Sequence, residues 1–254
     1  MKSTRTTGHA LSALTRSTAC AVIAGIILLI MASPPGVFAK EPDYAVLLIG
    51  NSHSARAGLP KVLKQLLEAD GSVATVKTVA GWNFLAERLE DRKTQHTLES
   101  QPWTHVVLQA QKYSSSGEYS YSTDAAEEWI RRSRSIGAQP ILFPEWARKG
   151  NTEEGSRIFM LHKGIAAREP ACVAPIGLAW EIMLDSNPDI RLHDDDGNHA
   201  NPNGGLLTAY VLYATITGKP VNELPDTRVS GVSDETRVLL QAAARHALTL
   251  APPC

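Results

Sequence analysis

Cysteine is scarce in this chain of 254 residues, and neither sign of charge dominates. Only three cysteines are present, too few for a disulfide scaffold, and no ligand-type residues cluster beside them as in metal sites. Charged residues make up 20% of the chain and the formal net charge is −1, so no excess of basic residues points to nucleic acid. Internal repeats, low-complexity tracts and domain-splitting linkers are also lacking. These absences favour a single ordinary globular domain.

The long uncharged apolar stretch lies near the N-terminus, at Ala19–Ala32, after three basic residues. Small residues occupy the −3 and −1 positions of a cut after Ala39. A basic start, a short apolar core and such a site predict a secretory signal peptide over residues 1–39. The alternative is an uncleaved anchor, the one expected membrane contact. Cys20 precedes the apolar core, which argues against a lipoprotein.

Removing that segment leaves residues 40–254, about 215 residues, which is enough for one domain with a sizeable core. We therefore expect an exported protein, either periplasmic or secreted. Cys172 and Cys254 remain in this region. In an exported protein they can join and hold the C-terminus, and two free thiols are equally consistent with the sequence.

Apolar runs of strand length alternate with helix-like segments across residues 40–254. The expected strands are Tyr44–Ile49, Val73–Ala80, His105–Ala110, Pro140–Phe143 and Cys172–Ile176. The expected helices are Pro60–Ala69, Phe84–Arg92, Asp124–Gly137, Glu153–Arg168, Gly177–Leu184, Gly204–Thr217 and Asp234–Leu250. Runs rich in Val, Ile and Leu are typical of parallel strands that are buried on both faces. The alternation predicts a three-layer α/β/α sandwich around a mostly parallel, about five-stranded sheet.

Three polar or small residues follow directly after predicted strands: Ser52, Gly81 and Gln111. In a parallel sheet the carboxyl ends of the strands meet at one edge, where ligands bind. We therefore expect these residues to share one site, although they are far apart in the sequence.

Ser52 belongs to Gly50-Asn51-Ser52-His53, and Asp196-Gly197-Asn198-His199 lies in a polar loop near the end of the chain. Asp196 can orient His199, which can then accept the proton of the Ser52 hydroxyl, so the set predicts nucleophilic catalysis. The plainer alternatives are a serine that caps a helix and a solvated acidic loop or weak cation site. The acidic residues lack the alternating spacing of a calcium loop, so we expect neither a metal nor a cofactor.

These motifs resemble those of the SGNH (GDSL-type) hydrolase superfamily, and the resemblance covers essentially all of residues 40–254. Gly50–His53 resembles the block that holds the nucleophile, Thr78–Trp82 the block whose glycine contributes to the oxyanion hole, and Asp196–His199 the block with the other two triad members. The segment from Pro202 to Pro220 resembles the closing helix of extracytoplasmic bacterial members. The resemblance implies the SGNH hydrolase fold, with Ser52 and Gly81 as oxyanion-hole donors.

The third block departs from the family pattern Gly-x-Asn-Asp, because this chain reads Gln109-Ala110-Gln111-Lys112. Gln111 aligns with the oxyanion-hole Asn, and its amide is able to donate an N–H to the developing charge. Gln109 is the alternative donor.

Other polar and aromatic residues are assigned plainer roles. We expect His53 to be a wall of the site or a substrate contact rather than a second base. Trp146 either lines the pocket or fills the core, whereas Trp180 is expected in the core. His246 is expected on the buried face of the last helix, and His193 in a solvated loop.

The resulting hypothesis is a serine ester hydrolase that forms an acyl-enzyme on a small acyl ester. The resemblance and the expected export suggest acetyl groups on carbohydrate. One alternative is an O-acyltransferase with the same triad, which passes the acyl group to a sugar hydroxyl. The other is a non-catalytic binding module that retains the fold. The oligomeric state is left open by the sequence.

Overall fold

The computed structural model describes residues 41–225 and 227–254. The expected signal peptide lies outside the described residues. Among those residues, no helix is both long and apolar enough to cross a membrane.

The centre of the fold is a five-stranded sheet in which every neighbouring pair of strands is parallel. The strands are β1 (Tyr44–Ile49), β2 (Ala74–Val79), β3 (His105–Leu108), β4 (Gln139–Leu142) and β5 (Cys172–Val173). Their spatial order is β2-β1-β3-β4-β5, which is the flavodoxin-like order. The predicted fold class is therefore confirmed. The direction of the strand order reverses at β1 and β3, and this switch point is where such sheets bind ligands.

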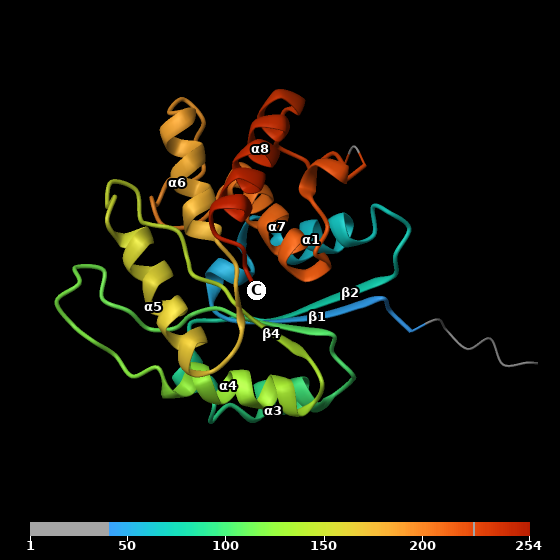
Figure 1. The fold of residues 1–254 in the computed structure, drawn as a ribbon, viewed down its shortest axis with the longest axis vertical. Helices are drawn as coiled ribbons and strands as arrows, with labels where there is room; N and C mark the ends of the chain where they lie inside the picture. Colours follow the sequence, from blue (N-terminus) through green and yellow to red (C-terminus); the bar gives the residue numbers. More distant parts are fainter. Residues whose placement is uncertain (1–40, 226) are drawn as a thin grey trace, which may run out of the picture. The chain divides into compact units, whose positions relative to one another are not determined.

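Helices cover both faces of the sheet (Figure 1). They are α1 (Leu59–Leu67), α2 (Leu85–Arg88), α3 (Arg92–Glu99), α4 (Asp124–Ser135), α5 (Glu154–Arg168), α6 (Ile176–Ser186), α7 (Pro202–Thr217) and α8 (Asp234–Leu250). One buried cluster joins the sheet to α1, α6, α7 and α8, and a second joins its other face to α3 and α4. Two separate apolar clusters on opposite faces are what a three-layer sandwich requires.

Helix α7 is apolar almost all round, as predicted, and is buried from Gly204 to Ile216. Its first turn passes very close to α6. A Cβ added at Gly204 would lie 2.5 Å from Cη2 of Trp180 and would overlap the carbonyl oxygen of Leu192. The absence of a side chain therefore lets α7 begin directly after the loop that carries His199.

Helix α3 was not predicted, because most of its residues are polar. Its helical content is explained by a cap and a small buried face. Asp91 accepts a hydrogen bond from the N–H of Lys93, and Thr94, Thr97 and Leu98 are buried. Two of the three buried residues are threonines. Because threonine is classed as polar, the apolar pattern of the sequence did not indicate this face.

The buried face of α8 differs from the expected one. Leu240, Ala243, Ala244 and Ala247 are buried against the core, whereas His246 is exposed, so the prediction for His246 was wrong. Three small alanines allow α8 to lie close to α6 and α7, and this packing outweighs the bulkier residues on the opposite side. Ser233 caps the helix by accepting a hydrogen bond from the N–H of Thr236.

The C-terminus is attached to the edge of the sheet. Cys172 and Cys254 form a disulfide across 82 positions of sequence, which decides between the two alternatives left open by the sequence. The N–H of Val173 also donates to the carbonyl of Pro253 at 2.7 Å. Closing a long loop of this kind restricts the unfolded chain and stabilises the folded one.

Candidate active site

Ser52 lies three positions beyond the end of the central strand β1, at the start of a short 3-10 helix that spans Ser52–Ser54. Asn51 caps this turn, because its Oδ1 accepts a hydrogen bond from the N–H of His53 at 3.0 Å. The apolar strand thus delivers the hydroxyl to the carboxyl edge of the sheet, and the polar turn holds it there.

The loop between α6 and α7 brings His199 to this hydroxyl. The distance from Ser52 Oγ to His199 Nε2 is 2.7 Å, and the distance from His199 Nδ1 to Asp196 Oδ2 is 2.5 Å. The carboxylate only accepts hydrogen bonds, so Nδ1 carries the hydrogen and Nε2 is free to accept the serine proton. The predicted Ser52–His199–Asp196 set therefore comes together in the geometry that nucleophilic hydrolysis needs.

Asp196 is fixed in its ionised form by several donors. The His199 ring, the backbone N–H of His199 and the backbone N–H of Asn198 together hold the pKa of Asp196 far below its ordinary value. The two backbone bonds, to Oδ1, are 2.8 and 2.9 Å long. The carboxylate can therefore stabilise an imidazolium without accepting its proton.

A cavity of about 250 Å³ opens above the nucleophile. Its lining consists of Asn51, Ser52, His53, Trp82, Phe84, Tyr113, Glu145, Arg148, Asn198 and His199. His53 is a wall of the site, as expected, and its ring stacks on that of His199 with 4.9 Å between centroids. Sequence reasoning missed Glu145, Phe84 and Arg148. The only feature of the sequence that could have identified them was their position in the segments that follow β2 and β4, at the carboxyl edge of the sheet.

Tyr113 contributes a neutral phenol to the cavity. Burial raises the pKa of its hydroxyl, and the negative charges of Glu145 and Glu154 raise that pKa further. The side chain is therefore a hydrogen-bond donor at every physiological pH. Tyr113 begins the polar loop that follows β3, and it lines the cavity.

The backbone supplies two candidate oxyanion donors. Within residues 41–225 and 227–254, the N–H groups of Ser52 and Gly81 donate no hydrogen bond to the protein, so both are available to a ligand. Gly81 precedes Trp82, which lines the cavity. These are the two backbone donors that the sequence motifs predicted.

Gln111 does not take the place that the sequence predicted. Its side chain is buried outside the cavity lining, and Nε2 donates to the carbonyls of Lys112 at 2.9 Å and Ser122 at 3.0 Å. Both amide hydrogens are thus used to hold the loop after β3, and the assignment of Gln111 to the oxyanion hole was wrong. Ala110 adopts a left-handed conformation with a φ of 75°, and this turn separates Gln111 from Gln109.

Gln109 is fully buried beneath the nucleophile turn. Its Oε1 accepts a hydrogen bond from the N–H of Asn51 at 2.7 Å, and its Nε2 donates to Glu145. A Cβ at Gly50 would overlap this Oε1, so the glycine makes room for the amide. The Gly50 carbonyl accepts from the buried guanidinium of Arg88 at 2.8 Å. Gln109 therefore supports the turn and does not line the cavity as an oxyanion donor.

Trp146 lies behind the site rather than in the lining of the cavity. It is buried, its ring lies 5.2 Å from that of His53, and its Nε1 donates to the carbonyl of Asn198 at 2.9 Å. Trp180 is in the core, as predicted. His193 was expected in a solvated loop, and this was wrong. It is buried against the edge of Trp180, and its Nε2 lies 2.8 Å from the carbonyl oxygen of Ala147.

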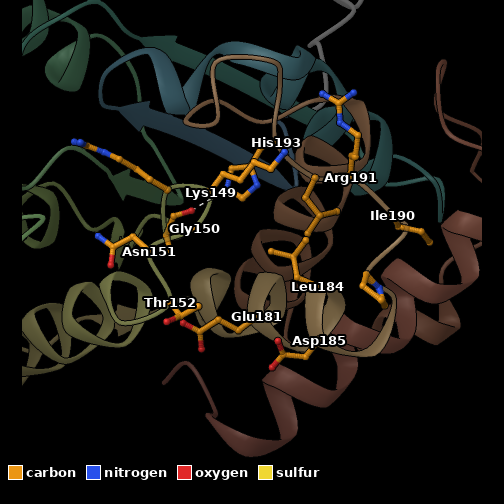
Figure 2. A pocket seen from close by; sticks show the side chains of 14 residues that line it. Lys149, Gly150, Asn151, Thr152, Glu181, Leu184, Asp185, Ile190, Arg191 and His193 are labelled. Atoms are coloured by element: carbon orange, nitrogen blue, oxygen red, sulfur yellow. Dashed lines mark hydrogen bonds between the residues drawn. The ribbon is translucent and has the colours of Figure 1, made fainter.

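Figure 2 shows a second cavity, of about 360 Å³, between the segment 147–152, helix α6 and the segment 188–193. It shares Arg148 with the cavity above Ser52 but contains none of Ser52, Asp196 and His199. Glu181 lies on its wall, and burial together with the nearby charge of Asp185 raises the pKa of Glu181. The smaller cavity, which holds the nucleophile, is therefore the candidate active site.

The protein therefore combines a flavodoxin-like parallel sheet with a serine–histidine–aspartate arrangement at the carboxyl edge of that sheet. No family model matches the sequence, and no curated protein matches it. Among solved structures, a protein from Slackia heliotrinireducens proposed to be an SGNH hydrolase is 24% identical, with a TM-score of 0.58 over 67% of this chain and 97% of its own. A DUF4886 family protein from Bacteroides uniformis is 18% identical, with a TM-score of 0.63 over 83% and 96%.

An acetylxylan esterase from Geobacillus stearothermophilus is also similar, at 12% identity and a TM-score of 0.54 over 70% of this chain and 96% of that one. These likenesses are at the level of the fold. The chain has the fold of the SGNH hydrolases, as its motifs predicted.

Proposed function

We propose that the protein is a serine ester hydrolase that removes small acyl groups, such as acetyl, from a carbohydrate through an acyl-enzyme. The observation that carries this proposal is the 2.7 Å contact between Ser52 Oγ and His199 Nε2, with Asp196 on the other side of the imidazole. A hydroxyl paired with an oriented base is an activated nucleophile.

In the proposed reaction, Ser52 Oγ attacks the ester carbonyl while its proton passes to His199 Nε2. The carbonyl oxygen becomes an oxyanion, which the N–H groups of Ser52 and Gly81 stabilise. The bond to the alcohol then breaks, and His199 gives its proton to the leaving oxygen. A water molecule, activated by the same imidazole, hydrolyses the acyl-enzyme and regenerates Ser52. These steps need only side chains and backbone groups of this chain.

Two features support a carbohydrate ester. The acetylxylan esterase, which has the same fold, acts on an ester of a carbohydrate. Trp82 lines the cavity yet is 85% exposed, and Phe84 lines the same cavity. An exposed aromatic face at the mouth of a catalytic cavity is suited to stacking on a sugar ring.

Export is proposed on two grounds. The basic and apolar pattern of residues 1–39 is typical of a signal peptide. The disulfide between Cys172 and Cys254 is of a kind that persists in oxidising compartments.

The experiment combines active-site labelling with turnover. A fluorophosphonate should add once to the intact protein, and peptide mapping should place the adduct on Ser52. Hydrolysis of 4-nitrophenyl acetate should fall at least about 10⁴-fold in Ser52→Ala, whereas Ser116→Ala in the exposed loop should match the wild type. Equal rates in Ser52→Ala and the wild type would favour a binding module. Transfer of acetyl to an added sugar, in place of release as acetate, would favour an acyltransferase.

A further inference from the structure

Glu145 is a buried carboxylate in the wall of the catalytic cavity, and the proposed steps of ester hydrolysis do not use it. It lies three positions beyond the end of β4, its exposed fraction is 6%, and it lines the same cavity as Ser52 and His199. A carboxylate is expensive to bury unless it has partners, so its presence beside the nucleophile calls for a role.

The position of Glu145 is set by the nucleophile turn itself. Oε1 accepts a hydrogen bond from Nε2 of Gln109, and Oε1 of Gln109 accepts one from the N–H of Asn51 at 2.7 Å. The carboxylate is thus connected through one buried amide to the residue before Ser52. A group held in this way is preorganised for a ligand.

The second oxygen of Glu145 faces the ring of His53. Oε2 lies 4.0 Å from Nε2 of His53, which is beyond hydrogen-bond distance. Asn51 Oδ1 accepts from the backbone N–H of His53 and lies 3.1 Å from Nδ1 of the same residue. The amide oxygen cannot donate, so Nδ1 carries the hydrogen of this contact, and Nε2 is the ring nitrogen that faces Glu145. The two side chains thus leave a gap that a hydroxyl group of a ligand, which both donates and accepts hydrogen bonds, is able to bridge.

Glu145 and His53 lie beside His199, the residue that protonates the leaving group in the proposed reaction. The departing alcohol oxygen must come close to His199 Nε2 to receive its proton, whereas the carbonyl oxygen turns toward the N–H groups of Ser52 and Gly81. His53 stacks on the ring of His199, and Glu145 lies next to His53. Hydroxyl groups on the alcohol part of the ester are therefore the donors nearest to this pair.

We propose that Glu145 and His53 form a specificity-determining pair that binds hydroxyl groups on the alcohol part of the substrate, so that esters of polyols are preferred over esters of simple alcohols. This inference rests on the proposed esterase function. A site that hydrogen-bonds a substrate hydroxyl discriminates against the analogue without it, because its buried polar groups are then left unpaired.

The test compares two esters with the same acyl group and the same carbon chain, 2,3-dihydroxypropyl acetate and propyl acetate. In the wild type, the ratio of kcat/KM for the dihydroxy ester over the plain ester should be about 10 to 100, the range for hydrogen bonds to a charged acceptor. In Glu145→Gln this ratio should fall to about 1–3, even if kcat/KM for propyl acetate itself also changes. The charge-matched control is Glu118→Gln on an exposed loop, which should keep the wild-type ratio.

A purely structural role would lower both kcat/KM values equally and leave the ratio unchanged, and that result would overturn the assignment. If Glu145→Gln does not fold, His53→Gln tests the pair from its other member and should also lose the preference. Ser52-dependent hydrolysis with no preference in the wild type would overturn this inference alone. The absence of any Ser52-dependent hydrolysis would overturn the proposed function together with it.

Discussion

The indole ring of Trp146 lies flat on that of Trp180, with 4.1 Å between ring centroids and 3° between ring planes. Trp180 belongs to the buried face of α6, whereas Trp146 contacts the active-site side chain of His53. Trp146 also donates its N–H to the carbonyl of Asn198, next to the catalytic histidine. The stack therefore connects the loop that carries His199 to the rigid core of the domain.

Loss of the Trp146 N–H should affect catalysis more than a comparable loss elsewhere. Trp146→Phe keeps an aromatic ring against Trp180 but leaves the Asn198 carbonyl without its donor. We expect kcat for 4-nitrophenyl acetate to fall about tenfold, because a small displacement of His199 weakens proton transfer.

The matched control is Trp103→Phe. Trp103 is equally buried and also donates to a backbone carbonyl, that of Thr97, but it precedes β3 at the opposite end of the sheet from Ser52. Its substitution should lower the melting temperature and leave kcat near the wild-type value. Equal kcat losses in the two variants would contradict a role for Trp146 in placing the His199 loop.

Gln111 should prove to be a loop anchor. In Gln111→Ala, the carbonyls of Lys112 and Ser122 lose their donor, so we expect a lower melting temperature. Removal of an oxyanion donor typically costs about 10²–10³ in kcat, and we expect a loss well below that range. Steady-state kinetics on 4-nitrophenyl acetate test this prediction. A fall in kcat of about 10²-fold or more would show that Gln111 is an oxyanion donor after all.

Buried histidine should make the fold sensitive to acid. Burial lowers the pKa of His162 to about 4, against the smaller opposing effect of the Ile158 carbonyl. An unfolded histidine takes up its proton near pH 6.5. Between these values the unfolded chain binds more protons than the folded one, so stability falls as the pH is lowered from about 6.5 to 4, by up to about 3 kcal/mol for a fully buried ring.

Urea unfolding at pH 7 and pH 4.5 measures this effect in the wild type and in His162→Leu, which cannot titrate. The variant should lose less free energy of unfolding between the two pH values. Burial also lowers the pKa of His105 to about 4. His105 should therefore contribute to the pH dependence of stability in both the wild type and the variant. The same pH dependence in the wild type and the variant would show that His162 is not responsible.

Local pattern was enough to predict several elements of the fold. The apolar run of β1 and the amphipathic start of α8 were placed with their observed bounds, because strand and cap signals are contained in a few adjacent residues. Helix α3 was not predicted, and the wrong face of α8 was predicted to be buried. The buried face of α3 includes threonines, and that of α8 consists mainly of alanines. Which face of such a helix is buried depends on the neighbouring helices, because small residues give only a weak apolar periodicity.

The sequence by itself determined the chemistry of the candidate triad, because Ser52 follows a buried strand and Asp196 lies three residues before His199. In a parallel sheet the carboxyl ends of the strands lie at one edge, so residues that follow these strands are expected near one another. Only the tertiary structure decided that Gln111 turns away, that Gln109 supports the nucleophile turn, and that Glu145 faces His53 across the cavity. These outcomes depend on side-chain directions and on contacts between residues 11 to 92 positions apart, which the pattern of neighbouring residues does not reveal.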